Sequence, residues 1–145
     1  MDAVAVSGPS HVGEQSLLGV DELRANRGDT VELVSAQAVG GPREGVTAYV
    51  LRLVETGGGG VGGISGDLFG DGLSFSRYAK PLSGFTFKQA DGPIQVVMRV
   101  VLNQPGAVSF SAVDVTFRID GGSLRVQELP TQGRVCFDDP TPATC

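Results

Sequence analysis

The chain has 145 residues and a net charge of −5, and its 22 glycines and 8 prolines accompany a hydrophobic fraction of 41%. This length suits one domain with a sizeable core, whereas so much glycine and proline excludes a helical bundle and favours short connections. The 11 basic residues are scattered singly, so no nucleic-acid partner is expected. No apolar run approaches the roughly 20 residues that span a bilayer, so no membrane insertion within this chain is expected either.

The N-terminal residues 1–14 show little periodicity and are expected to form a loose leader, although residues 3–6 would suit an edge strand. The one histidine of the chain, His11, lies in this leader. A catalytic base must be held within hydrogen-bond reach of its nucleophile by rigid packing, which a loose leader does not provide. The sequence therefore predicts no catalytic residue and no enzyme activity.

The folded domain is expected to span residues 15–137. Residues 30–36 alternate apolar and polar side chains, which is typical of a strand with one buried face. Residues 46–54 are apolar on both faces except at Thr47 and Arg52, which favours a central strand. The stretch 17–23 suits either a short helical turn or a strand.

The segment 57–84 is the least regular part of the chain. Gly57 to Gly63 include six glycines, and glycine loses the most backbone entropy on ordering, so we expect a mobile loop there. No lysine or following helix supports a phosphate-binding loop. Asp67 and Asp71 flank a glycine turn and are candidate calcium ligands, because calcium binds through several oxygens. The alternative is that both aspartates only form the turn.

The strongest strand pattern lies in the last third of the chain. Residues 94–102 are expected to form one long strand, and residues 113–119 and 124–126 alternate as the two arms of a β-hairpin. We expect Asp120-Gly121 to be its two-residue loop, which places Thr116 opposite Arg125 and avoids an Arg–Arg pair. The outer face of residues 97, 99 and 101 is a candidate surface for a protein partner.

Seven to nine short strands without a convincing long helix predict an all-β fold. We expect an antiparallel, immunoglobulin-like β-sandwich, with an open β-barrel as the alternative. The immunoglobulin tryptophan is missing, because the chain contains no Trp. A calcium- or carbohydrate-binding sandwich remains the alternative to a structural or protein-interaction role.

The two cysteines, Cys136 and Cys145, lie close together at the C-terminus. Two cysteines alone do not make a tetrahedral zinc site, which needs four ligands. We expect a disulfide that ties the tail 138–145 to the last strand, in an oxidising compartment. The alternative is two free thiols.

The C-terminal half resembles extracytoplasmic β-sandwich domains of uncharacterised actinobacterial proteins that are secreted or membrane-anchored. Residues 108–122 (VSFSAVDVTFRIDGG) carry the resemblance, followed by Pro130 and a strand that contains Cys136. The resemblance covers about forty residues and implies an extracytoplasmic location with an accessory or interaction role. It implies no catalytic residue.

Overall fold

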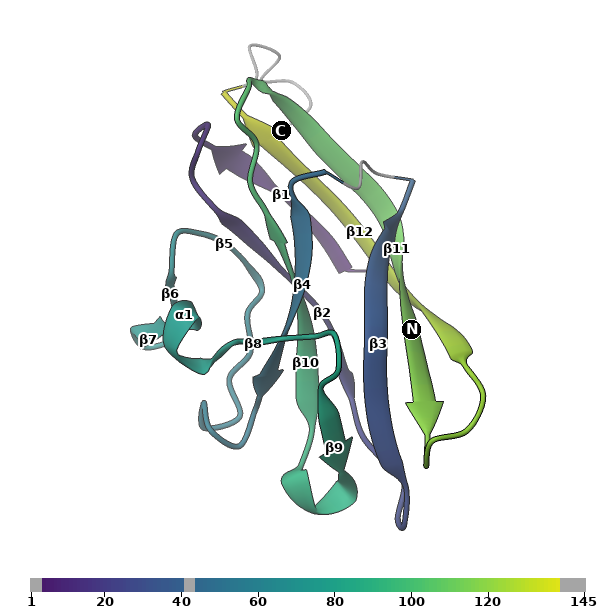
Figure 1. Cartoon of the computed structure of the whole chain (residues 1–145). Coiled ribbons are helices and arrows are strands. Elements are labelled where there is room, and N and C mark those ends of the chain that lie inside the picture. The colour runs from purple at the N-terminus through teal and green to yellow at the C-terminus, as the bar shows by residue number, and fades with distance from the viewer. Residues whose placement is uncertain (1–3, 41–43, 139–145) are drawn as a thin grey trace.

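The computed structural model describes residues 4–40 and 44–138, and they form two packed sheets and one small hairpin (Figure 1). The sheets are not closed into a barrel, so the prediction of an all-β sandwich is confirmed and the barrel alternative is wrong. Two short helical turns, α1 (Phe75–Tyr78) and a 3₁₀ turn (Gln89–Asp91), interrupt the strands.

The first sheet has five strands in the order β1-β12-β11-β3-β9. Their bounds are β1 (Val4–Ser10), β12 (Arg125–Phe137), β11 (Gly106–Ile119), β3 (Thr30–Val39) and β9 (Thr86–Lys88). The second sheet has the order β5-β2-β10-β4-β8. Its strands are β5 (Gly63–Ser65), β2 (Ser16–Leu23), β10 (Ile94–Val100), β4 (Val46–Arg52) and β8 (Lys80–Pro81).

The small hairpin consists of β6 (Leu68–Phe69) and β7 (Leu73–Ser74). The described residues contain more strands than the seven to nine expected, because the segment 63–88 contributes five strands of two or three residues each. The long strands keep an immunoglobulin-like order. The trios β2-β10-β4 and β12-β11-β3 correspond to strands B-E-D and G-F-C of that architecture.

The first strand corrects the prediction of a loose leader over residues 1–14. Residues 4–10 form β1, which pairs in parallel with β12 from Val4 opposite Thr131 to Ser10 opposite Phe137. The chain then crosses to the second sheet, where residues 16–23 form a strand and not a helical turn. The sandwich therefore includes residues 4–10, and residues 1–3 lie outside the described part.

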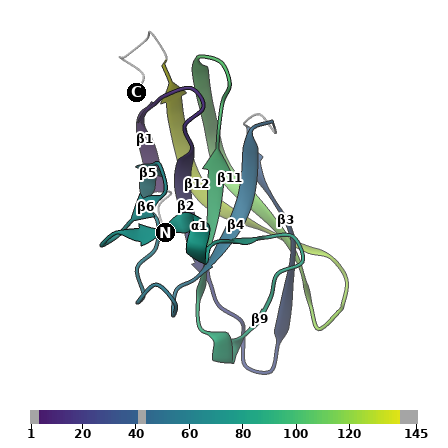
Figure 2. The same ribbon diagram turned by 60° about the vertical axis from the view of Figure 1, so that its left-hand side comes forward.

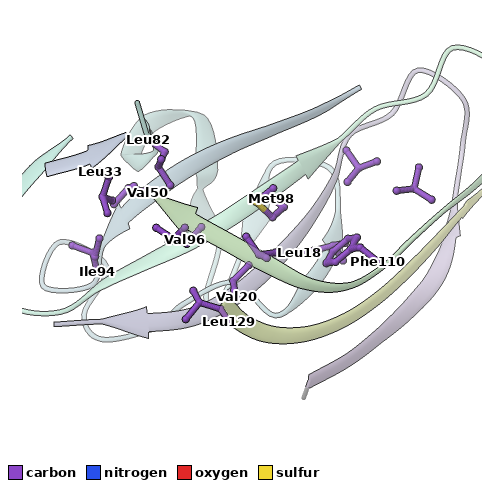
Figure 3. Close-up of a cluster of buried hydrophobic side chains, with 14 of the residues drawn as sticks. Leu18, Val20, Leu33, Val50, Leu82, Ile94, Val96, Met98, Phe110 and Leu129 are labelled. Carbon is purple, nitrogen blue, oxygen red and sulfur yellow. The ribbon is translucent and has the colours of Figure 1, made fainter. Parts of the chain in front are cut away.

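The main core fills the space between the two sheets. Alternate residues of β10, Ile94, Val96 and Met98, are at most 1% exposed and pack in the main hydrophobic cluster. Figure 3 shows this cluster, which includes Leu18 and Val20 from β2 with Phe110 from β11 and Leu129 from β12. The period-two alternation expected for half-buried strands therefore directs one face of each sheet inward.

The predicted hairpin exists, but its register was wrong by one residue. Thr116 pairs with Val126, and Phe117 pairs with Arg125. The connection runs from residue 120 to 124, and Asp120 and Gly121 both have left-handed φ angles of 51° and 72°. β12 then continues through Pro130, which is tolerated because a bulge of β11 lies opposite.

A second hydrophobic cluster covers the outer face of the second sheet. Val97 and Leu51 of this sheet are fully buried under Val61, Phe69 and Phe75 of the irregular segment. Figures 1 and 2 show β6 and α1 of that segment beside the sheet. The predicted partner surface around residues 97, 99 and 101 is therefore wrong, because the chain covers Val97 with its own segment 61–79.

Candidate functional site

Asp67, one of the two candidate calcium ligands, has a structural role in this fold. Its carboxylate accepts hydrogen bonds from the Ser74 hydroxyl (2.6 Å), the Ser76 backbone N–H (2.9 Å) and the Ser76 hydroxyl (3.1 Å). These bonds, that of Ser74 foremost, hold the pKa of Asp67 below its usual value of 3.8. Asp67 thus joins the start of β6 to the first turn of α1.

Asp71 lies in the exposed turn between β6 and β7. Within residues 4–40 and 44–138, no three His, Cys, Asp or Glu side chains are grouped as metal ligands. The structure therefore gives calcium at Asp67 and Asp71 no geometric support, and that assignment stays a prediction.

The glycine-rich loop is held by hydrogen bonds, which corrects the expectation that it lacks a fixed shape. Gln95 of β10 is 8% exposed and accepts a bond from the Val61 N–H at 2.8 Å. Its side-chain amide donates to the carbonyl oxygens of Val61 (2.8 Å) and Val20 (3.3 Å). The Gly19 N–H donates to Gly62 O at 2.7 Å. This loop therefore anchors the second hydrophobic cluster.

The residues that follow β1 contact the residue that follows β12. Asp138 accepts hydrogen bonds from the Val12 N–H at 2.9 Å and lies 3.0 Å from His11 Nδ1. The Asp138 hydrogen bond and charge raise the pKa of His11 above 6.5. Cys136 is buried at the end of β12, whereas Cys145 lies outside the described residues. The predicted disulfide therefore stays a prediction.

The edge of β12 nearest the hairpin loop carries exposed apolar side chains. β1 flanks β12 only at residues 131–137, so residues 125–130 have no strand on their outer side among the described residues (Figure 1). Leu124 and Val126 are 54% and 65% exposed, although they are apolar. Open edges with apolar side chains mark sites where another chain adds a strand.

A cavity of about 170 Å³ opens beside this edge, at the end of the sandwich. Leu33, Phe87, Val115 and Phe117 are among its apolar walls. Gln127 lines the cavity from β12, and the polar residues Arg24, Asn26 and Asp29 line it from the β2–β3 connection. A cavity of about 150 Å³ lined by apolar side chains admits a benzene molecule, so one aromatic ring fits here.

The outer face of the same edge carries two carboxylates side by side. Asp114 of β11 lies directly opposite Glu128 of β12. Like charges in directly opposed positions destabilise a sheet. No ion pair within the described residues includes either side chain.

Sequence reasoning named neither the β12 edge nor the cavity. The available signal was the run from Leu124 to Glu128, which mixes apolar and charged residues directly after a turn. No protein-family model and no curated protein matches the chain. In the part of the chain that the structure describes, no helix is long and apolar enough to cross a membrane.

Proposed function

We propose that this chain is a non-enzymatic, extracytoplasmic domain with a structural or protein-interaction role. The edge of β12 at residues 125–130 has no partner strand among the described residues, and its exposure of Val126, with Leu124 just before it, is the observation that carries the proposal. Natural sandwiches usually protect such an edge with charges, prolines or a covering loop. Here the neighbouring apolar side chains favour contact with another protein.

The extracytoplasmic part of the proposal is supported by the cysteine pair and by the resemblance of residues 108–122. Disulfides persist in oxidising compartments and are rare in the cytosol. We expect the purified chain to show no free thiol under denaturing conditions, and a mass lower by two hydrogens. Two titratable thiols in protein purified without reductant would remove this support.

The interaction role is tested by cross-linking in the cells that produce the protein. A photoreactive phenylalanine analogue replaces Val126 in the full chain, and a matched variant carries it at Val54. The two valines are 65% and 63% exposed, so exposure alone does not distinguish them. We expect a discrete adduct from position 126 only. Equal adducts from both positions, or none from position 126, would refute the proposed role.

A further inference from the structure

The β12 edge and the neighbouring cavity share one residue, which links a backbone site to a side-chain site. Gln127 belongs to the part of β12 that has no strand on its outer side among the described residues, and it also lines the cavity. Its partner across the ladder is Val115, which faces the core, so Gln127 lies on the inner face of the sheet. A strand added along this edge would therefore place one of its inward side chains next to the cavity.

The two faces of such an added strand meet different chemistry. Neighbours of Gln127 face the cavity, whose walls are largely but not wholly apolar, whereas neighbours of Val126 and Glu128 face outward, because side chains alternate along a strand. On the outward face, Glu128 and Asp114 form the pair of like charges described above. A basic side chain opposite Glu128 would relieve their repulsion. Arg125 does not supply this charge, because it pairs with Phe117 on the inner face.

We propose that residues 125–128 of β12 bind an extended segment of a partner protein in which apolar and basic residues alternate. The apolar side chain enters the cavity beside Gln127, and the basic side chain lies opposite Glu128. This inference rests on the proposed interaction role and names the chemistry of the partner. The net charge of −5 of the whole chain favours a basic partner as well.

A second copy of this chain fits the edge less well. Antiparallel pairing of β12 with itself about a two-fold axis places Leu124, Val126 or Glu128 of the copy opposite Glu128, depending on the register. None of these residues is basic, so the repulsion between Asp114 and Glu128 would persist. A segment of another protein with alternating apolar and basic residues offers an apolar side chain for the cavity and a basic side chain for Glu128.

The test uses isotope-labelled full chain and a short synthetic peptide of alternating lysine and valine with a central phenylalanine. A matched peptide has glutamate in place of each lysine. We expect saturable binding of the lysine peptide, with amide shifts concentrated at residues 124–128 and at Leu23 and Phe117 around the cavity. Exchanging the central phenylalanine for alanine should weaken binding.

Charge reversal supplies the decisive comparison. Glu128→Lys should lower the affinity for the lysine peptide about tenfold, because an attractive cross-strand pair becomes repulsive. The same variant should bind the glutamate peptide more tightly than the unchanged chain does. Glu44→Lys makes the same charge change at an exposed glutamate elsewhere and should leave the affinity unchanged. Equal effects of both variants, shifts outside the β12 edge, or a β12-mediated dimer in sedimentation would overturn the proposal.

The outcomes separate this inference from the proposed function. No peptide binding together with a discrete adduct at position 126 would overturn the alternating basic chemistry and leave the interaction role in place. No peptide binding and no adduct would overturn both.

Discussion

The buried amide of Gln95 is expected to hold the glycine-rich loop onto the second sheet. Replacing it by leucine keeps a similar volume but removes its bonds to the Val61 N–H and carbonyl oxygen, both 2.8 Å long. A buried backbone group without a partner costs about 1–3 kcal/mol. Two such groups lose their partners in Gln95→Leu, and water satisfies them in part, so we expect the free energy of unfolding to fall by about 2–4 kcal/mol. That is a large share of a total stability of about 5–15 kcal/mol.

Urea denaturation of Gln95→Leu measures this loss, and amide hydrogen exchange locates it. We expect faster exchange at Val61 and at Gly19, whose N–H donates to Gly62 O. Gln37→Leu is the control, because Gln37 is an exposed glutamine of β3. A change below about 0.5 kcal/mol, the scale of an ordinary surface substitution, would refute the anchoring role of Gln95.

Three further predictions concern contacts at other places in the sandwich. Gly133→Ala should cost about 1–3 kcal/mol in urea denaturation, because the added Cβ would lie 2.7 Å from the Phe110 ring. Gly62→Ala, where no atom lies within 4 Å of the added Cβ, is its control, and equal losses would contradict the prediction. The ion pair between Asp138 and His11 should stabilise the fold below pH 6.5, because the protonated histidine is the favoured partner of the carboxylate. This stabilisation should weaken as the pH rises through the raised pKa of His11. The exchange protection factor of the Val12 amide reports this change, and a flat profile would exclude it. Asp67→Ala should lower stability by about 1 kcal/mol with calcium or with EDTA alike, because a cap-like hydrogen bond is lost. The lowered pKa of Asp67 means that this contribution is present above pH 3.8 and is lost as pH falls through the lowered value. A calcium-dependent rise in melting temperature, absent in Asp67→Ala, would instead establish the calcium site.

The long strands were predictable because their burial follows local alternation. Val31 and Leu33 are buried in β3, as their period-two spacing indicates. The hairpin register was not predictable, because the connection between the two strands runs from residue 120 to 124 and is longer than a two-residue turn. The sequence favoured a two-residue turn there, and one residue of slip exchanges the two faces of a strand.

The covering segment 61–79 and the candidate site both depend on contacts between distant residues. Gln95 bonds to Val61, 34 positions away in the chain, so no local pattern identified the loop as anchored. The stretch 94–102 was expected to expose Val97 on an outer face. Instead, the covering segment 61–79 buries Val97. Among the described residues, β12 has a strand on its outer side only at residues 131–137, which sequence alone does not indicate.

The parallel pairing of β1 with β12 has a mechanical consequence. The two strands run in the same direction, with Val4 at one end of their ladder and Phe137 at the other. Tension applied between these two residues would slide the strands past each other along their length. The backbone hydrogen bonds of the pair would then share the load and break together, not one after another. The sandwich is therefore built to resist stretching between its first and last strands.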